Sequence, residues 1–379
     1  MKAGWRTATV GEICTLATGG TPSKTKPEYF KDGEIKWLVS GDVHNKEIFD
    51  CNGRISQLGY DNSNARFLPV NSVIIALNGQ GKTRGTVAVL RTVATCNQSL
   101  VSISPRDLQT LLPEYLYYNL HGRYDEIRRM TGDAGNERRG LNMPLIRSIS
   151  LPLPPLDEQK RIVALLDEAF EGLDRARANA EANLADARGY LRAFAQEQLN
   201  LSDAENAALG DTCEIYQPQT ISKKEMSPDG EFVVYGANGP IGRYHQFNHE
   251  QPQLLVTCRG ATCGNVNISE PFSWITGNAM VVRPKTRALI VQYLEAYFRY
   301  VMDFRSVITG SAQPQITRTS LSPVRVPIPE ISVQHELIEL ISDVEAKTQA
   351  LQDAYTQSLA DLDALRQSLL QKAFSGELT

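Results

Sequence analysis

Positively charged side chains stand in two short glycine-rich segments of this 379-residue sequence. Residues 79–85 read Gly-Gln-Gly-Lys-Thr-Arg-Gly and carry Lys82 and Arg84, and residues 259–264 read Arg-Gly-Ala-Thr-Cys-Gly and begin with Arg259. Lysine and arginine bind the phosphates of nucleic acids, and arginine also pairs with guanine. The first segment lacks the Walker spacing of a nucleotide-phosphate loop. We therefore interpret both segments as turns that face DNA.

The other candidate DNA contacts lie in polar loops of the same two regions. Asparagine and glutamine amides can read adenine edges, whereas arginine and lysine contact mainly phosphate or guanine. Because lysine and arginine are mostly exposed in any protein, roughly half of such a set is ordinary surface charge. The candidates are Thr21, Ser23, Lys24, Lys26, Arg138 and Arg139 in the first region and Lys223, Lys224, Arg243, Tyr244, Gln313, Gln315 and Arg318 in the second.

The sequence lacks a convincing catalytic set for methyl transfer or DNA cleavage. A methyltransferase needs a glycine-rich cofactor loop and an Asn/Asp-Pro-Pro-Tyr/Phe loop, but the only Pro-Pro pair, at residues 154–155, precedes a helix. Glu34 and Lys36, with Glu12 upstream, have the local look of a Mg²⁺-dependent nuclease site, although a solvated hairpin explains them more simply. We predict a non-catalytic chain without a cofactor.

Two histidines and two cysteines, His245, His249, Cys258 and Cys263, raise the alternative of a zinc site. Cys258 aligns with the apolar Leu77 of the other half of the chain, however, and that half has no such set. We predict structural roles for these residues and no metal. The six cysteines of the chain are scattered, which favours free thiols in a reducing compartment.

A long, proline-free, Ala- and Leu-rich tract must position these loops, and it follows the sequence Leu-Pro-Leu-Pro-Pro-Leu at residue 151. Proline cannot sit inside a helix, so Asp157 is the predicted N-cap of a helix that runs to Leu199. At about 1.5 Å per residue this helix would span roughly 60 Å. Apolar residues alternate at spacings of four and three, which is typical of a coiled-coil seam. The seam contains Leu166, Leu173, Ala180, Ala187, Tyr190 and Phe194.

A second copy of this element follows 175 residues later. The shift aligns Leu151-Pro-Leu-Pro-Pro-Leu with Val326-Pro-Ile-Pro-Glu-Ile, and Gln159 with Gln334. The order globular segment, long helix, globular segment, long helix indicates a tandem duplication. Because a pseudo-twofold brings the second helix back toward the first, we expect the helices to pair antiparallel. The second seam contains Ile341, Leu351, Tyr355, Leu362, Leu365 and Leu369.

Both globular segments combine short β-rich runs with a helix, which predicts α+β domains. The first segment has expected strands at 35–39, 72–77, 85–90 and 100–103 and an expected helix at 113–130. The second repeats this order, with Phe232-Val-Val-Tyr-Gly in place of Trp37-Leu-Val-Ser-Gly. The loops between these elements differ between the copies. One scaffold is therefore predicted to present two different binding surfaces.

Charge is segregated along a chain of ordinary globular composition, with 42% hydrophobic residues, 22% charged residues and a net charge of −4. Residues 1–150 hold 19 Lys and Arg against 14 Asp and Glu (19 − 14 = +5), and residues 205–329 hold 11 against 10 (+1). The helical residues 151–204 hold 6 against 10 (−4), and residues 330–379 hold 3 against 9 (−6). The globular parts thus suit DNA phosphates, and the helices suit protein partners.

Apolar runs in the sequence are short. None approaches the roughly 18 residues of a membrane span, and the first residues lack the apolar core of a signal peptide. We expect a cytoplasmic protein without membrane contact.

Four motifs together resemble one family, the specificity subunit of type I restriction-modification systems. They are Gly-Gly-Thr-Pro-Ser at residue 19, Pro-Leu-Pro-Pro-Leu-x-Glu-Gln-Lys-Arg-Ile at residue 152, a second glutamine-containing copy at residue 327, and Gln-Lys-Ala-Phe-Ser-Gly-Glu-Leu at residue 371. The resemblance covers essentially the whole chain. The second copy departs from it, with Ser332-Val-Gln-His in place of Asp157-Glu-Gln-Lys and no Gly-Gly-Thr-Pro near residue 215.

The resemblance implies target recognition domains at residues 1–150 and 205–325, and helical spacers at 151–204 and 326–379 that form an antiparallel coiled coil. Each domain would read one half of a split, asymmetric site in double-stranded DNA. The helices would act as a ruler and dock two methyltransferase subunits, and restriction-translocase subunits would join the full complex. Two alternatives stay open: the specificity chain of a combined, type IIB-like restriction-methylation enzyme, and a coiled-coil scaffold that binds no nucleic acid.

Overall fold

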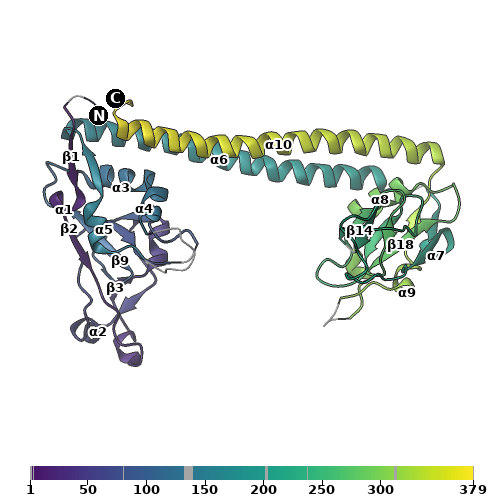
Figure 1. Cartoon of the computed structure of the whole chain (residues 1–379), viewed down its shortest axis with the longest axis horizontal. Helices are drawn as coiled ribbons and strands as arrows, with labels where there is room; N and C mark the ends of the chain where they lie inside the picture. Colours follow the sequence, from purple (N-terminus) through teal and green to yellow (C-terminus); the bar gives the residue numbers. More distant parts are fainter. Residues whose placement is uncertain are drawn as a thin grey trace. The chain divides into compact units, whose positions relative to one another are not determined.

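The computed structural model describes residues 2, 4–79, 81–131, 140–200, 204–236, 238–310 and 314–378. Its contacts divide the chain into two compact units, of which unit 1 comprises Met1–Asn179 with Ser358–Thr379 and unit 2 comprises Ala180–Gln357. Each unit contains one globular domain together with parts of two long helices, α6 (Leu156–Leu199) and α10 (Ile331–Ser375) (Figure 1). We call the globular domain of unit 1 the first domain and that of unit 2 the second domain.

The first domain contains a five-stranded mixed sheet in the order β2-β9-β6-β7-β4 and a three-stranded sheet in the order β5-β3-β8. Strand β1 pairs antiparallel with β10, directly before α6. Aliphatic runs form the central strands β6 and β7, which are buried at every position because both of their faces are covered. The strands are β1 (Arg6–Thr9), β2 (Cys14–Thr18), β3 (Ile35–Leu38), β4 (Glu47–Ile48), β5 (Arg54–Ile55), β6 (Val73–Ala76), β7 (Val87–Leu90), β8 (Thr95–Cys96), β9 (Leu100–Pro105) and β10 (Ser150–Leu153).

Helices of the first domain are short, and the one predicted at 113–130 is two helices. The break follows Gly122, where a Cβ would lie 3.0 Å from the Cβ of Leu370 in α10. Glycine is a poor helix former, and here its lack of a side chain lets α10 approach. The helices are α1 (Val10–Ile13), η1 (Pro27–Tyr29), η2 (Ser40–His44), α2 (Gln57–Asp61), α3 (Pro113–Gly122), α4 (Tyr124–Arg129) and α5 (Met143–Ser148).

The second domain repeats this framework with fewer elements. Its sheets have the orders β12-β18-β15-β16 and β14-β13-β17, and β11 pairs antiparallel with β19 directly before α10. The strands are β11 (Asn206–Ala208), β12 (Cys213–Tyr216), β13 (Phe232–Gly236), β14 (Gly239–Tyr244), β15 (Leu254–Thr257), β16 (Val266–Ile268), β17 (Trp274–Ile275), β18 (Ala279–Pro284) and β19 (Arg325–Pro327). The helices are α7 (Leu209–Thr212), α8 (Val291–Tyr300), η3 (Phe304–Ser306) and α9 (Arg318–Leu321).

Corresponding contacts confirm that the two domains share one tandemly repeated fold. In each domain the central strand of the three-stranded sheet has one parallel neighbour, which is β8 for β3 and β17 for β13. A Cβ at Gly11 would lie 3.1 Å from the Cβ of Arg147, and one at Gly210 would lie 3.0 Å from the Cβ of Ser322. Gly11 and Gly210 thus allow the same close approach of a later helix in the two domains. The domains differ after β3, where residues 39–72 of the first carry three elements, η2, β4 and α2, in addition to β5, the counterpart of β14.

Both long helices begin at equivalent positions, because Ile331 lies 175 residues after Leu156. The helix start predicted from an N-cap at Asp157 is wrong by two residues, because the first helical residue is Leu156 rather than Glu158. Asp157 lies inside the first turn, where its carboxylate still suits the positive end of the helix dipole. The amides of Glu158 and Gln159 both donate to the Pro155 carbonyl, at 2.9 and 3.0 Å.

Within each unit the two helical segments run antiparallel. In unit 1, Arg177 pairs with Asp363 and Arg366 with Asp174, so residue numbers rise along one helix as they fall along the other. Leu166 and Leu173 of α6 belong to the same apolar core as Leu370 of α10. In unit 2, Ala195 and Leu199 of α6 share a core with Leu337 and Ile341 of α10.

The seam is narrower than the sequence predicts. Ala180, Ala187 and Ile341 are buried, and Phe194, Tyr355, Leu362 and Leu369 are half-buried. Tyr190, Leu351 and Leu365 are instead 61%, 45% and 48% exposed, contrary to the prediction that they lie in the seam. Each follows a seam position by three residues, which turns it about 60° away from the partner helix.

One buried glutamine anchors each domain to its long helix. The Gln159 side chain accepts from the Leu112 amide at 3.0 Å and donates to the carbonyls of Thr110 and Pro154 at 2.9 and 3.0 Å. Leu112 precedes α3, so the glutamine ties that helix to the start of α6. Its three contacts satisfy backbone groups that would otherwise be buried without partners.

Gln334 makes the same three contacts in the second domain. Its side chain accepts from the Ile290 amide at 2.9 Å and donates to the carbonyls of Ala288 and Pro329 at 2.8 and 2.9 Å. Tyr115 and Tyr293 add a second repeated link, because their hydroxyls donate to the carbonyls of residues 152 and 327 at 2.9 and 3.0 Å. These contacts explain why glutamine and the preceding prolines recur 175 residues apart.

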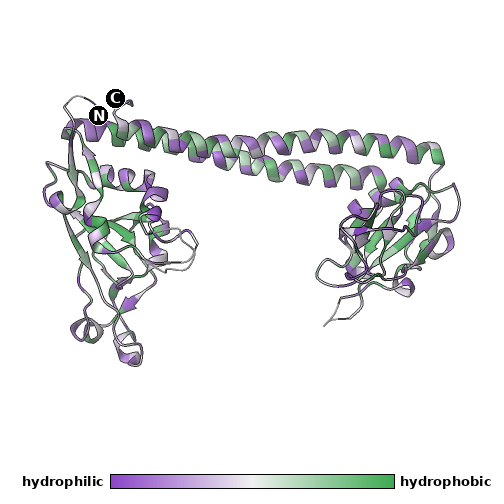
Figure 2. Ribbon diagram, viewed as in Figure 1, coloured by the Kyte–Doolittle hydropathy of each residue, from purple (hydrophilic) through white to green (hydrophobic). Residues whose placement is uncertain are grey.

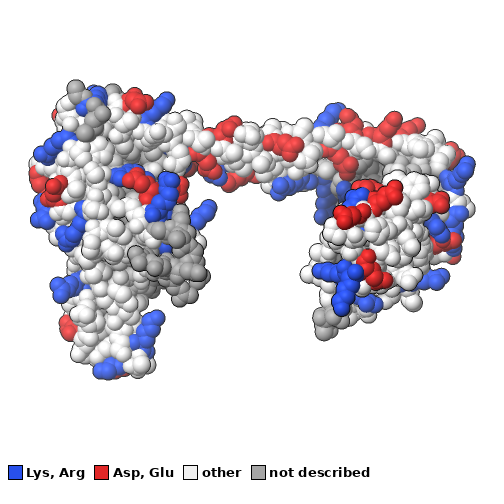
Figure 3. Space-filling view, in the orientation of Figure 1, with Lys and Arg blue, Asp and Glu red and all other residues white. Residues whose placement is uncertain are grey.

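Surface properties of the parts differ. Acidic side chains recur along α6 and α10, while lysine and arginine are spread over both domains (Figure 3). Figure 2 shows that hydrophobic residues concentrate in the strands inside each domain. Over the described ranges, no helix is both long and apolar enough to cross a membrane.

Candidate nucleic-acid interface

The glycine-rich turn of the first domain connects β6 to β7. Gly81 and Gly85 adopt φ angles of 64° and 86°, a region that favours glycine. The Lys82 carbonyl accepts from the Tyr124 hydroxyl at 2.8 Å, and the Gly81 carbonyl accepts from the Arg128 guanidinium at 2.8 Å. Helix α4 thus fixes the backbone of the turn. The exposed Lys82 side chain remains available for other contacts.

The two cations of this turn differ in environment. Lys82 is exposed, whereas Arg84 is half-buried and its Nε has no hydrogen-bond partner among the described residues. Leaving a buried donor unsatisfied costs about 1–3 kcal/mol, so Arg84 would be stabilised if its side chain turned outward to an acceptor such as a phosphate. Arg91 shows the contrast, because its guanidinium is held by Glu47 at 2.7 Å and Glu114 at 2.6 Å. Arg91 is therefore a structural cation, and Arg84 fits an anion contact.

The corresponding turn of the second domain connects β15 to β16 and is held by a different segment. Arg259 and Gln315 form an isolated antiparallel bridge, which brings these two candidates side by side. The Ile316 amide donates to the Cys258 carbonyl at 3.0 Å. Gly264, like Gly85, has a positive φ, here 95°. Both Arg259 and Gln315 are exposed, so a cation and an amide lie side by side at the surface of this turn.

The Gly-Gly-Thr-Pro segment of the first domain packs directly on β8. A Cβ at Gly19 would overlap the Cys96 carbonyl oxygen, and a Cβ at Gly20 would lie 2.8 Å from the Asn64 carbonyl carbon. The Trp37 indole donates to the Gly20 carbonyl at 3.0 Å. In the second domain the glycine is on the other side of this contact, where a Cβ at Gly277 would lie 2.8 Å from the Pro218 carbonyl. The second domain therefore has no Gly-Gly near residue 215, because the opposite segment supplies the glycine of this contact, Gly277. We call this an exchange of sides.

Polar residues after Gly20 form the next loop of the first domain. Thr21 donates to the Gln98 side chain at 2.6 Å, and Ser23 and Lys24 are exposed. Lys26 lies over the Tyr29 ring and donates to its hydroxyl at 3.0 Å, a bond that raises the pKa of Lys26. Lys26 therefore keeps its positive charge at neutral pH, as a phosphate contact requires.

Candidates in the loops of the second domain have more varied roles. Lys223 and Lys224 are exposed on the loop before β13. The Arg243 guanidinium donates to the carbonyls of Gly230 and Glu231, both at 2.6 Å, and so holds that loop onto β14. The Tyr244 ring packs edge-on against Trp274 at 5.2 Å. Arg243 and Tyr244 are thus engaged within the domain, unlike the two lysines.

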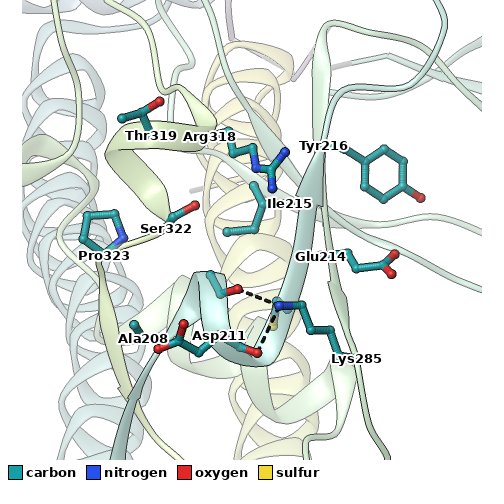
Figure 4. A pocket seen from close by; sticks show the side chains of 12 residues that line it. Ala208, Asp211, Glu214, Ile215, Tyr216, Lys285, Arg318, Thr319, Ser322 and Pro323 are labelled. Carbon is teal, nitrogen blue, oxygen red and sulfur yellow. Dashed lines mark hydrogen bonds between the residues drawn. The ribbon is translucent and has the colours of Figure 1, made fainter.

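Arg318 lines a pocket of about 670 Å³ between α7, β12 and α9, together with Thr319 and Ser322 (Figure 4). Lys285 also lines it and donates to the carbonyls of Gly210 and Asp211 at 2.7 and 3.1 Å. Ser322 occupies the position of the larger Arg147 in the first domain, which leaves more space here. Asp211 and Glu214 also line this pocket, so its two cations are balanced by two carboxylates.

Three candidates, Arg138, Arg139 and Gln313, lie outside the described residues. Reasoning from the sequence also missed the residues that support the turns. Tyr124 and Arg128 are four residues apart on α4, with the guanidinium 5.3 Å from the ring centroid, and both donate to the 79–85 turn. Their spacing was visible in the sequence, but the residues they contact lie 42 and 47 positions earlier. Only the tertiary fold reveals that pairing.

Residues that the sequence analysis considered for a nuclease site or a zinc site have local structural contacts. Glu12 accepts from the Thr9 amide at 2.6 Å and caps α1, a contact that lowers the pKa of its carboxyl group. Lys36 donates to the Phe49 carbonyl and the Thr92 hydroxyl at 2.9 and 2.8 Å. His249 is hydrogen bonded to Tyr216 at 2.8 Å. Cys258 is buried and donates to the Asn278 carbonyl at 3.1 Å.

Comparison with known proteins gives a consistent result. The family model for the type I restriction modification DNA specificity domain matches residues 2–182 and 202–359. The specificity subunit of the Escherichia coli type I restriction enzyme EcoR124I/EcoR124II is 28% identical over 43% of this chain and 40% of that subunit. The specificity subunit of the E. coli enzyme EcoprrI is 22% identical over 90% of this chain and 88% of that subunit.

A solved structure shares the fold. A chain from a study of complex assembly and conformational transition of the type I R-M system superimposes with a TM-score of 0.83 at 19% identity, covering 100% of this chain and 99% of that chain. The tandem arrangement of two domains and two long helices is therefore a known architecture.

Proposed function

Because the chain belongs to the family of type I restriction modification DNA specificity domains, we propose that it is the sequence-recognition subunit of a type I restriction-modification complex. Each domain would read one half of a bipartite, asymmetric site in double-stranded DNA. The single observation that carries this proposal is the repeated turn after β6 and after β15, which presents cations from the same place on two equivalent scaffolds. The surrounding loops differ, as two different half-sites require.

The contact residues of the two half-sites follow from this assignment. The first half-site would be bound by cations on exposed or half-buried positions of two loops of the first domain. These are Lys82, Arg84, Lys24 and Lys26. The second half-site would be bound by four cations and one amide, which can contact an adenine edge. These are Lys223, Lys224, Arg259, Arg318 and Gln315.

Partner subunits are also part of the proposal. The helical segments carry net charges of −4 and −6, so they repel DNA and suit protein. We propose that they bind two methyltransferase subunits, which restriction-translocase subunits join, and that they fix the spacing between the half-sites. The chain itself would be non-catalytic and would act in the cytoplasm, where its DNA substrate is.

An exchange of one domain tests the proposal. Residues 1–150 are replaced by the matching domain of a relative, and the methylated sites in the host genome are sequenced. One half of the recognised site should change while the other half and the spacer stay the same, because the domains have separate cores. Replacement of residues 205–325 is the matched control and should change only the other half. A change in both halves from either exchange contradicts the proposal.

A further inference from the structure

A network of side-chain amides and hydroxyls joins two loops of the second domain. Asn238 lies between β13 and β14, and its side chain donates to the Thr262 hydroxyl in the glycine-rich turn at 2.8 Å. The Asn238 side-chain oxygen accepts from the Thr257 hydroxyl at 3.2 Å and from the Asn265 side chain at 3.4 Å. Thr257 is fully buried, so the network is anchored in the core of the domain.

Asn265 is exposed, but its backbone is fixed at both polar groups. Its amide donates to the Thr262 carbonyl at 3.0 Å, and its carbonyl accepts from the Thr257 amide at 2.8 Å. Gly264, directly before it, donates to the Thr257 carbonyl at 2.9 Å and has a φ of 95°. An exposed side chain on a fixed backbone presents its polar atoms at a defined place, as sequence-specific recognition requires.

The Asn265 side chain keeps one donor and one acceptor for an external ligand. A primary amide has two N–H donors and one oxygen acceptor. One N–H of Asn265 is used by Asn238, and the described part of the chain offers this side chain no other hydrogen bond. In the major groove, adenine presents the matching pair, an N6 donor beside an N7 acceptor. Guanine presents two acceptors there and cytosine one donor, so the amide fits adenine best.

A pocket of about 340 Å³ adjoins this amide. Asn265 lines it together with Met302 and Phe304, which are both half-buried. Phe304 packs on the turn itself, because a Cβ at Gly264 would lie 2.8 Å from the Phe304 Cβ. Arg299, the cation of the pocket, is paired within α8. Apolar side chains contact the methyl group of thymine, so an amide beside this apolar wall matches the major-groove edge of an A·T pair.

The first domain has no amide at the equivalent position. Ala76 and Thr86 correspond to Thr257 and Asn265, because the Ala76 amide donates to the Thr86 carbonyl at 3.1 Å in the same way. Ala76 has no hydroxyl to anchor a network, and the Thr86 hydroxyl donates to the Lys82 carbonyl at 2.7 Å. The amide therefore distinguishes the second domain from the first, as a residue that reads only one half-site must.

One contact of the network does recur in the first domain. Thr83 and Thr262 each stand two residues before the last glycine of their turn. His44 is hydrogen bonded to Thr83 at 3.1 Å, as Asn238 is to Thr262. The segment after the central strand of the three-stranded sheet thus holds the turn in both domains, and only in the second does it also hold an amide.

We propose that Asn265 reads an adenine in the second half-site and that Asn238 is a positioning residue, which orients the Asn265 side chain. This inference rests on the proposed function and identifies one base that the second domain recognises. The Asn265 oxygen accepts from adenine N6, and its second N–H donates to N7. Phe304 contacts a thymine methyl group of this base pair or the next.

The test uses the full chain assembled with its methyltransferase subunit and duplexes that carry its recognition site, as methylome sequencing defines it. Each position of the site is replaced in turn by the other three base pairs, and competition binding gives the preference at that position. The variants are Asn265→Ala, Asn238→Ala and the two combined. Gln251→Ala is the matched control, since Gln251 is an exposed amide before β15, at the end of the strand away from the turn.

The wild type and the control should prefer one A·T pair in the second half-site by about 5- to 150-fold, which is the range for a bidentate contact. Asn265→Ala should abolish that preference alone and leave the first half-site and the salt dependence unchanged, because no phosphate contact is lost. Asn238→Ala should weaken the same preference in part. The combined variant should match Asn265→Ala, because Asn238 acts through Asn265.

Unchanged preferences in Asn265→Ala would overturn the inference. So would a loss at a G·C pair, or a uniform loss of affinity for all duplexes, which indicates a phosphate contact or a structural role. Additive effects of the two substitutions, or a lowered melting temperature of Asn238→Ala with uniformly weaker binding, would refute the positioning role. If the wild-type complex shows no sequence preference, the proposed function itself fails.

Discussion

The two globular domains make the same contacts to the long helices and differ in the loops that carry the candidate DNA contacts. We call these loops the rim of each domain. Gln159 and Gln334 make the same three hydrogen bonds, and Tyr115 and Tyr293 donate to equivalent carbonyls. The glycine-rich turns, in contrast, are held by α4 in the first domain and by a bridge to Gln315 in the second. The shared strands therefore fix the position of each turn, whereas the segment that holds the turn differs between the domains.

This difference separates two requirements on the sequence. Residues that join a domain to its helix are buried and satisfied by backbone groups, so substitution there affects the stability of the unit. Residues of the rim are exposed or paired locally, so substitution there changes what the domain contacts. Predictions for corresponding positions in the two units test that separation.

The largest contrast is expected at the loop after β2. In Gly19→Ala the new Cβ overlaps the Cys96 carbonyl oxygen, and backbone must move to relieve it. We expect unit 1 to lose at least about 3 kcal/mol of stability. Gln217→Ala in unit 2, one residue before Pro218, which corresponds to Gly19, should cost about 1–2 kcal/mol, because it removes side-chain contacts to the Gly277 carbonyl and the Cys258 sulfur.

Urea unfolding of each variant measures these values. The reverse experiment is Gly277→Ala, which should damage unit 2, since its Cβ would approach the Pro218 carbonyl. Equal stability of Gly19→Ala and Gln217→Ala would refute the exchange of sides at this contact.

The next effect should be equal in the two units. Gln159→Leu and Gln334→Leu each leave one amide and two carbonyls without their partner, at positions that are fully buried. Each substitution should destabilise its own unit by about 2–4 kcal/mol, and the two values should agree within about 1 kcal/mol. Hydrogen exchange at β9 and β18 measures the units separately. A large effect in one unit alone would show that the two anchors are not equivalent.

The framework was open to prediction from the sequence because its signals are local or repeated. Prolines, the glutamine and the heptads recur at a fixed interval, which identified both helices and their pairing. The width of the seam was not predictable in this way. Leu351 and Leu365 have the residue type and spacing of a seam position, and only the rotation of the packed helices places them outside it.

The rim could be predicted only in part. Lys82 and Arg259 were recognisable as cations in glycine-rich turns, but the neighbours of each turn come from distant segments. Arg243 illustrates the limit, since a cation in a polar loop proved to hold the carbonyl of Gly230. Residue type alone does not distinguish a cation engaged by its own backbone from one available to DNA.

A smaller effect concerns DNA affinity. Lys82→Ala and Arg259→Ala each remove an exposed cation without an ion pair in the described structure, so folding should be unaffected. In the assembled complex, each should weaken binding several-fold and reduce the slope of log affinity against log salt by about one. Fluorescence anisotropy with the cognate site measures both. Arg91→Ala is the contrasting control, because loss of its bonds to Glu47 and Glu114 should lower stability.

The smallest effect is the pH dependence that His249 adds to the second domain. His249 forms an isolated bridge with Ser273, and the corresponding bridge of the first domain is made by Leu68, which cannot titrate. Burial and the nearby Arg283 charge lower the pKa of His249. Its ring nitrogens are hydrogen bonded to Tyr216 at 2.8 Å and Asn248 at 2.6 Å.

A histidine whose pKa is lower in the folded than in the unfolded state binds its proton preferentially on unfolding. Its contribution to stability is therefore complete above the unfolded pKa of about 6.5 and is lost as the pH falls below that value. In His249→Gln, the slope of the unfolding free energy of unit 2 against pH should decrease by at most about one proton between pH 7.5 and 5.5. Hydrogen exchange at β12 and β18 follows unit 2, and β2 and β9 report unit 1, where the half-buried His121 keeps its own pH dependence. An unchanged slope in unit 2 would show that His249 is already protonated, or equally solvated, in the folded domain.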